Sequence, residues 1–389
     1  MIPYGRQHID ADDIRAVVEV LEGGALTQGP KVDAFEEAIR SYVGAKYAVA
    51  MASGTAGLHL AALAAGVGPG NALVTSPITF VASSNAALYA GGSPLFADVD
   101  PGSVNMSPAS LRDVLRQNKN VRAIVPVHFG GLPCDMEAIK AAADAAGAIV
   151  IEDAAHALGA TYADGTRVGN CRYSAMTMFS FHPVKAIAAG EGGMITTNDE
   201  ALYRRLLRLR SHGINKLDDP LEMPAQAATE GVGNLWYYEM QELGFHYRIT
   251  DIQCALATSQ LSKIDKFLAR RRALVHAYDE AFAHLKNARP AQSERQRSGH
   301  HLYVLRIDFK EIGTTRAVLM KELRARDIIT QVHYIPVPAH PFYRKLGFEP
   351  EDYPNAQRYY EEGLTIPLFY DLTDAQQRHV IASVEELVR

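Results

Sequence analysis

The sequence has few cysteines, no long apolar run and no concentration of positive charge. The three cysteines, Cys134, Cys171 and Cys254, are too few and too scattered for a disulfide framework or a zinc knuckle, so we expect packing roles for them. No apolar stretch approaches the roughly 20 residues that span a bilayer, and the N-terminus lacks the charged and apolar regions of a signal peptide. We therefore expect a cytoplasmic protein.

The charge balance makes small molecules the expected ligands. The formal net charge is -5 and the sequence pI is about 6.3. The longest basic block is 270–272, so neither nucleic acid nor an acidic membrane surface is expected as the main partner. The four histidines that invite a metal interpretation have no ligand-rich neighbourhood at the usual spacing, so no metal site is expected: His300, His301, His333 and His340.

The length and pattern of the chain predict an α/β protein. A chain of 389 residues with 48% hydrophobic content buries a large core and suggests two domains, or one large domain with an appendage. From residue 45 to about 200, β-branched runs alternate with alanine-rich helical stretches, which indicates a mostly parallel sheet. We expect strands within 46–52, 71–77, 93–100, 123–129, 148–155, 175–181 and 192–199, and helices within 55–66, 80–91, 107–117 and 136–147. Polar residues that follow these strands should share one crevice at the strand C-termini.

The rest of the chain predicts a lid and a second domain. Residues 212–240 lack periodicity and are too long for a connector, so we expect a functional loop or lid there. A long helix over 249–284, strands over 301–309 and 328–334, a helix over 314–326 and a C-terminal helix from about 373 then follow. We expect a large domain over 1–248, with residues 1–12 as an N-terminal arm, and a smaller α+β domain over 249–389.

A lone lysine raises the question of chemistry. Lys185 lies in FSFHPVKAIAAGEGG, after a strand and before a glycine-rich tail. It is either a solvated residue at the edge of a sheet or a reactive amine. One strand-and-turn unit upstream, the apolar run AIVI leads into Glu152, Asp153 and His156. Asp153 is either a helix N-cap or a carboxylate that pairs with a protonated pyridine nitrogen in the same crevice.

Three further features fit the same cofactor. Gly54 and Thr55 lie between a strand and a helix, where free N–H groups bind phosphate, although such a segment is often only a turn. Ser180 could reach the same phosphate or be a structural residue, and Phe80 covers a flat ring or belongs to the core. An amine, an acid, a phosphate-binding helix start and an aromatic cover are together what pyridoxal 5'-phosphate (PLP) requires. We therefore expect Lys185 to hold PLP as an imine and to move protons when released.

The sequence also resembles the DegT/DnrJ/EryC1/StrS family of sugar-nucleotide aminotransferases over essentially its whole length. The resemblance is carried, in order, by LTQGPKVDAFEEA, SGTAGLHLA, SPITFVASSNAALYAG, FADVDP, VPVHFGG, IEDAAHALGA, FSFHPVKAIAAGEGGMITTND, RSHGI, YRITDIQCALATSQLSKID, QVHYIP and LTIPLF. It implies the aspartate-aminotransferase fold (fold type I of PLP enzymes), PLP as the cofactor, and a homodimer with shared active sites.

The resemblance further implies roles for single residues. Lys185 would carry the cofactor, Asp153 would pair with the pyridine nitrogen, His156 would lie near the ring hydroxyl and Phe80 would stack on the ring. The residues implied at the cofactor phosphate are Gly54, Thr55, Ala56 and Ser180. Those implied around the sugar nucleotide are Tyr4, Leu26, Thr27, His182, His333 and Tyr334.

Two departures from the family pattern concern ligand contacts. The family usually has an asparagine, reaching the phosphate of the neighbouring subunit, where this chain has His246. An imidazole N–H makes the same kind of bond, so we expect altered affinity rather than loss. Ala188 and Ala189 stand where threonines are common, which removes possible hydrogen bonds to substrate.

Within the family, the variants MQELGFHYR, VPVHFGGLPCD and QVHYIPV are most similar to the branch that makes UDP-4-amino-4,6-dideoxy-N-acetyl-β-L-altrosamine for pseudaminic acid. This implies transamination of a UDP-linked 4-keto-6-deoxy-N-acetylhexose, with L-glutamate as the amino donor. Other nucleotide-sugar 3- or 4-aminotransferases, for example one making perosamine, and a PLP-binding regulator without turnover remain alternatives. The related 3-dehydratases are disfavoured because they have histidine where Lys185 stands.

Overall fold

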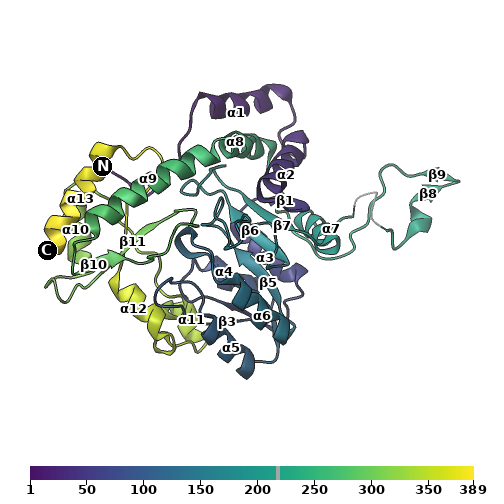
Figure 1. The fold of residues 1–389 in the computed structure, drawn as a ribbon. Coiled ribbons are helices and arrows are strands. Elements are labelled where there is room, and N and C mark those ends of the chain that lie inside the picture. Colours follow the sequence, from purple (N-terminus) through teal and green to yellow (C-terminus); the bar gives the residue numbers. More distant parts are fainter. Residues whose placement is uncertain (216–219) are drawn as a thin grey trace.

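The computed structural model describes residues 1–215 and 220–389 (Figure 1). Its largest element is a seven-stranded sheet in the order β1-β7-β6-β5-β4-β2-β3. Its strands are β1 (Tyr47–Met51), β2 (Ala72–Thr75), β3 (Ser93–Phe96), β4 (Val121–Val125), β5 (Ile149–Asp153), β6 (Met176–Ser180) and β7 (Gly193–Thr197). Every neighbouring pair is parallel except those made by β7, which runs antiparallel to β1 and β6. The expected mostly parallel sheet is confirmed.

Helices bury both faces of this sheet. The helices of the region are α2 (Pro30–Val43), α3 (Gly54–Ala64), α4 (Ala82–Tyr89), α5 (Pro108–Gln117), α6 (Met136–Ala146) and α7 (Glu200–Arg210). Successive residues of a strand point to opposite faces, so Ala48 and Ala50 of β1 pack in one cluster and Val49 and Met51 in another. Because both faces are apolar, the strands read as nearly continuous hydrophobic runs.

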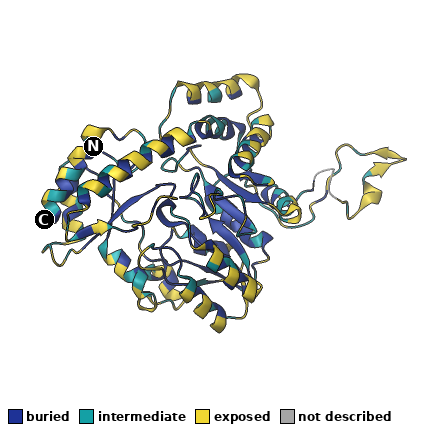
Figure 2. Cartoon of the chain, in the orientation of Figure 1, coloured by how far each residue is buried: buried dark blue, intermediate teal, exposed yellow. Residues whose placement is uncertain are grey.

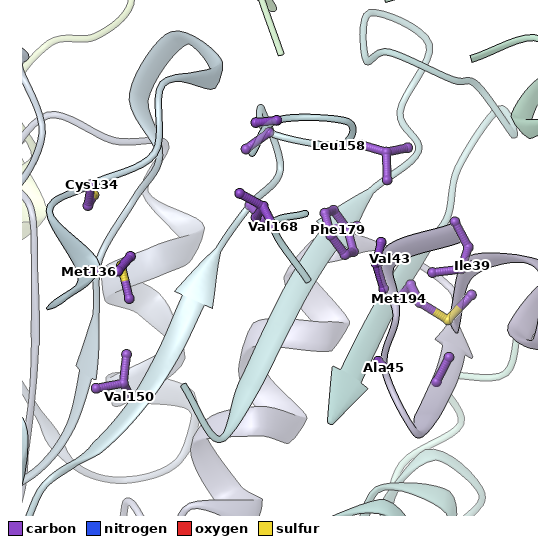
Figure 3. Packing of buried hydrophobic residues seen from close by; sticks show 14 of the residues in the cluster. Ile39, Val43, Ala45, Cys134, Met136, Val150, Leu158, Val168, Phe179 and Met194 are labelled. Carbon is purple, nitrogen blue, oxygen red and sulfur yellow. The ribbon is translucent and has the colours of Figure 1, made fainter. Parts of the chain in front are cut away.

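The first of these clusters is shown in Figure 3, where side chains from several elements meet. Ile39 and Val43 of α2 pack with Phe179 of β6 and Met194 of β7 in this cluster, and all four are buried. The cluster fixes the position of β6, whose far end leads into the loop that carries Lys185.

The C-terminal part forms a smaller antiparallel sheet of β10 (Ala288–Pro290), β11 (Tyr303–Ile307) and β12 (Gly363–Ile366). Its helices are α9 (Ile264–Phe282), α10 (Arg316–Ala325), α11 (Pro341–Lys345), α12 (Pro354–Glu362) and α13 (Asp374–Val388). The strand expected over 328–334 is wrong: the segment makes only isolated bridges, from Ile328 to Ile2 and from Gln331 to Thr365. Residues 331–334 instead turn toward the large domain and line a cavity.

The single helix expected over 249–284 is also wrong, since α8 (Asp251–Leu261) and α9 are separate. The break falls at Ser262 and Lys263, and the Nζ of Lys263 lies 2.7 Å from both Asp10 and Asp13, at the start of α1 (Ala11–Gly23). Asp251 caps the neighbouring helix α2, accepting the N–H groups of Gly29 at 2.8 Å and Lys31 at 2.9 Å. These contacts hold α8 against α1 and α2, beside the large sheet.

Helix α9 contributes side chains to two hydrophobic cores, its first part to one and its second part to the other. Side chains from Ile249 to Leu268 join the core of the large sheet, whereas those from Leu274 onward join the core of the small sheet. Ile2, at the other end of the chain, also packs in the small core. The domain boundary expected between residues 248 and 249 stays a prediction. The two cores suggest a boundary within α9, and we propose that it lies between residues 268 and 274.

Part of the segment expected as a lid projects from the body of the molecule (Figure 1). It carries a hairpin of β8 (Ala228–Thr229) and β9 (Val232–Gly233), and Figure 2 shows it as largely exposed. Residues 216–219 of this expected lid lie outside the described residues. In the ranges 1–215 and 220–389, no helix is long and apolar enough to cross a membrane.

Candidate active site

A cavity of about 540 Å³ lies at the carboxyl ends of the parallel strands, with one wall from the small domain. Strand ends, helix starts and the 331–334 segment meet there, as expected when parallel strands gather their loops at one edge. Eleven of the residues singled out from the sequence line it: Tyr4, Gly54, Thr55, Phe80, Asp153, His156, Ser180, His182, Lys185, His333 and Tyr334.

Lys185 and Asp153 approach the cavity from adjacent parallel strands. Asp153 ends β5, and Lys185 follows β6 in a turn closed by its N–H to the His182 carbonyl at 2.8 Å. Burial lowers the pKa of Lys185 to about 8, and the attraction of Asp153 acts in the opposite direction. With that pKa, roughly a tenth of the amines are neutral at pH 7. The lowered pKa and the position of Lys185 in the cavity wall favour a reactive amine over a solvated residue at a sheet edge.

Asp153 is a buried acceptor, and no helix begins after it before β6, so the helix-cap interpretation is wrong. Its Oδ1 accepts the Ala155 N–H at 3.1 Å and its Oδ2 accepts the Ser83 O–H at 2.7 Å. Burial raises the pKa of Asp153, while the bonds from Ser83 and Ala155 act to lower it. A carboxylate with two oxygens has room for further donors, so Asp153 fits a protonated ring nitrogen.

The start of α3 forms a cradle for phosphate. Ser53 caps this helix by accepting the Ala56 N–H at 3.1 Å, while the N–H groups of Gly54 and Thr55 have no acceptor among the described residues. A Cβ at Gly54 would lie 3.0 Å from the Cβ and 3.3 Å from the Oγ of Ser180, so glycine leaves room at this serine. Two free N–H groups at a helix start beside a hydroxyl suit a phosphate dianion.

Aromatic and imidazole groups line the rest of the cavity. Phe80 is 59% exposed, which excludes the core interpretation and leaves its face free to cover a ring. The Nε2 of His156 lies 3.2 Å from the Tyr334 hydroxyl, and its buried Nδ1 has no hydrogen-bond partner among the described residues. Burial, and then the charge of Lys185, lower the pKa of His156 well below 6.5. His156 is thus a neutral imidazole with one atom available to a ligand.

Sequence reasoning missed several lining residues, among them Ser83 and His301. The ring centroid of His301 lies 4.3 Å from that of His156, and both rings are buried. No pattern distinguishes His301 from His300, which is buried but does not line the cavity. For Ser83 a signal exists: it lies three residues after Phe80, with Phe80 just before α4 and Ser83 in its first turn.

Other predicted residues lie outside this lining. Leu26 and Thr27 are exposed, and Thr27 bridges to Thr250. Ala56 gives its N–H to the helix cap. His246 is exposed, with its Nε2 3.0 Å from Arg248. The two alanines of the departure noted above, Ala188 and Ala189, are buried in the protein, so their small size bears on packing.

An amine of lowered pKa, a buried carboxylate, a phosphate cradle and an exposed aromatic face around one cavity define a PLP site of an aminotransferase. The chain belongs to the DegT/DnrJ/EryC1/StrS aminotransferase family, whose model matches residues 7–385. It is 39% identical to the spore coat polysaccharide biosynthesis protein SpsC of Bacillus subtilis, over 100% of this chain and 97% of that protein.

Solved structures give the same result. Helicobacter pylori PseC, an aminotransferase involved in the biosynthesis of pseudaminic acid, superposes with a TM-score of 0.89 at 28% identity, over 100% of this chain and 99% of that chain. Spr1654 of Streptococcus pneumoniae in its PMP form has a TM-score of 0.89 at 27% identity, over 100% of this chain and 99% of that chain. The protein is therefore a PLP-dependent sugar aminotransferase of fold type I.

Proposed function

We propose that the protein transfers the amino group of L-glutamate to a UDP-linked 4-keto-6-deoxy-N-acetylhexose. The product would be UDP-4-amino-4,6-dideoxy-N-acetyl-β-L-altrosamine, a precursor of pseudaminic acid. The observation that carries the reaction class is the shared cavity of Lys185 and Asp153. The likeness to PseC supports the pseudaminic acid branch, and the name of the relative SpsC supports a sugar destined for a surface polysaccharide.

The residues of the cavity divide the work of transamination. When bound, PLP supplies a ring that takes up the negative charge formed at the substrate carbon. Asp153 would keep the ring nitrogen protonated, and the N–H groups of Gly54 and Thr55 would hold the phosphate. The amine of Lys185 would move a proton at the substrate carbon. Its pKa of about 8 suits this role, because a general base works best with a pKa near the operating pH.

The small-domain wall is suited to an uncharged sugar. Burial lowers the pKa of His333 to about 3, so its imidazole is neutral, and its Nδ1 lies 2.9 Å from the Thr365 hydroxyl. The ring of Tyr4 lies 5.3 Å from that of His333. Neutral N–H and O–H groups on aromatic side chains hydrogen-bond sugar hydroxyls without the cost of burying a charge. Tyr4, His333 and Tyr334 would therefore contact the keto sugar.

We also propose that the active form is a homodimer with shared sites. The cofactor phosphate, the diphosphate and glutamate all carry negative charge, yet among the described residues the lining holds one lysine and no arginine. The projecting segment exposes apolar side chains, with Leu235 95% and Trp236 72% exposed. Exposed apolar surface of this kind is typical of protein contacts. A second copy would cover it and bring hydrogen-bond donors for phosphate, such as the ring N–H of His246, to the cavity.

A substrate panel tests the proposed reaction. Purified enzyme is incubated with L-glutamate and UDP-, dTDP- or GDP-linked 4-keto sugars, and products are identified by mass. We expect turnover of the UDP-linked N-acetyl sugar, whereas exclusive turnover of dTDP or GDP sugars would reject the pseudaminic acid branch. Glutamate alone should convert the visible band of the bound cofactor to the PMP form, and a regulator without turnover would leave it unchanged. For the dimer, a fully active monomer on a sizing column would contradict the proposal.

A further inference from the structure

A chain of two hydroxyl groups leads from the cavity wall to the carboxylate of Asp153. Ser83 is fully buried, and its Oγ lies 2.7 Å from the Asp153 Oδ2. The Oγ1 of Thr79 lies 2.7 Å from the same Ser83 Oγ. Thr79, Ser83 and Asp153 all line the cavity. Two hydroxyls in sequence therefore stand behind one carboxylate of the cavity.

The charge of Asp153 decides which way these hydroxyls point. An ionised carboxylate only accepts, so Ser83 must donate its single proton to Asp153. The Ser83 oxygen then accepts the proton of Thr79. If Asp153 were protonated at Oδ2, it would donate to Ser83, and Ser83 would turn its proton away from Asp153, to the Thr79 hydroxyl 2.7 Å away or to the Phe80 carbonyl 3.3 Å away. The 2.7 Å contacts from Thr79 to Ser83 and from Ser83 to Asp153 thus allow both hydroxyl protons to point toward an ionised carboxylate, and in that arrangement both hydroxyls support the anion.

The same turn also places the ring cover. Thr79 and Phe80 precede α4, and Ser83 is the second residue of that helix. The N-cap residue of α4, Val81, offers no side-chain cap, so the position of this turn depends on tertiary contacts such as the bond from Ser83 to Asp153. The Ser83 N–H also bonds the Phe80 carbonyl at 3.2 Å, so the aromatic face of Phe80 and the donor to Asp153 belong to the same turn.

We propose that Ser83, oriented by Thr79, is a positioning residue that keeps Asp153 ionised and fixes its carboxylate for the ring nitrogen of the cofactor. Other charges act on Asp153 as well: the amine of Lys185 and the imidazole of His128 favour the anion. Those groups stay in place when Ser83 or Thr79 is replaced. The contribution of the hydroxyls is therefore measurable as a difference between variants.

The experiment measures binding of pyridoxamine 5'-phosphate to the cofactor-free full chain as a function of pH. This probe has the same ring nitrogen and phosphate as PLP but no aldehyde, so it forms no imine with Lys185. Binding needs an ionised Asp153, and affinity is therefore lost as the pH falls through the pKa of that carboxyl. Removing a donor raises this pKa, so in Ser83→Ala the acid limb should move up by about one pH unit, the size of one charge-assisted hydrogen bond.

Two matched pairs separate this role from packing. Ser84→Ala removes the adjacent buried hydroxyl, which bonds Tyr343 at 2.6 Å and not Asp153, and should leave the acid limb where it is. Thr79→Val should shift the limb in the same direction by less, and Thr79→Ser should restore it. The proposal is overturned if the affinity of Ser83→Ala falls at the same pH as that of wild type. It is also overturned if Ser83→Ala and Ser84→Ala shift the acid limb equally. If Ser83→Ala does not fold, an unshifted limb in Thr79→Val overturns it.

Discussion

Glu152, the residue before Asp153, offers a sharp test of how the site is anchored. It is fully buried on the opposite side of β5, and its carboxylate accepts four side-chain donors. Oε2 accepts His128 Nε2 at 2.7 Å and Tyr162 at 2.5 Å. Oε1 accepts Ser174 at 2.6 Å and Thr177 at 3.2 Å. These donors tie the end of β5, and with it Asp153, to the surrounding loops.

Replacing Glu152 by Gln keeps the shape and removes the charge. The amide oxygen would remain toward His128 and Tyr162, whose bonds change from charge-assisted to neutral, while the hydroxyls of Ser174 and Thr177 rotate to accept from the amide. A bond to a charged group is worth about 1 kcal/mol more than a neutral one, so the two bonds predict a loss of about 2 kcal/mol in the free energy of unfolding. Glu152→Leu leaves all four donors without an acceptor and should cost at least about 4 kcal/mol.

Urea unfolding of the cofactor-loaded protein measures both values, with exposed Glu311→Gln as the control, which should stay within about 0.5 kcal/mol of wild type. Burial raises the pKa of Glu152, but the bonds from His128, Ser174 and Tyr162 outweigh burial and hold it below the ordinary 4.5. A depressed pKa gives stability above pH 4.5 that is lost as the pH falls through the folded value. The difference in the free energy of unfolding between wild type and Glu152→Gln should therefore become smaller as the pH is lowered. An equal cost for the Leu and Gln variants would refute the reasoning.

Three further predictions concern the amine and the core. Lys185→Ala should lose the pyridoxyl adduct that borohydride fixes in wild type, as read by peptide mass. It should also lower kcat for glutamate turnover at least about 100-fold. An adduct on another residue would contradict the assignment. The rate at which the cofactor-free protein captures PLP, followed by stopped-flow absorbance, should rise with pH and level off above about pH 8. The reason is that burial lowers the pKa of Lys185 to about 8 and only the neutral amine reacts. A midpoint of this pH dependence near 10.5 would show an unperturbed lysine. Arg210→Ala should destabilise the fold by about 3 kcal/mol, because it leaves the largely buried Glu36 carboxylate, 2.6 Å from Arg210, without its cationic partner. Glu36→Gln in the same chain should recover part of this loss in urea unfolding.

The large sheet could be predicted because its strands are apolar on both faces. All seven appear where short runs such as AIVI stand out between alanine-rich helices. The pairing of Asp153 with Lys185 in one cavity follows from the same pattern, since consecutive parallel strands present their ends at one edge. The small sheet is harder to predict from the sequence. Its strand β10 has only three residues, and residues 328–334 carry a strand-like pattern but make only isolated bridges. Such short pairings are decided by tertiary contact and not by periodicity.

The residues that escaped prediction are those placed by contacts between distant segments. His301 reaches the cavity because its loop lies against Gly130 and Gly131, with the His301 N–H bonded to the Gly130 carbonyl at 2.9 Å. Gly131 has a φ of +101°, and a Cβ there would lie 2.9 Å from both the His156 carbonyl oxygen and the His300 nitrogen. Only glycine permits this approach of backbone to backbone. The contact between the rings of His301 and His156 thus depends on a missing side chain at Gly131, more than a hundred residues before His301, and the sequence around His301 carries no sign of it.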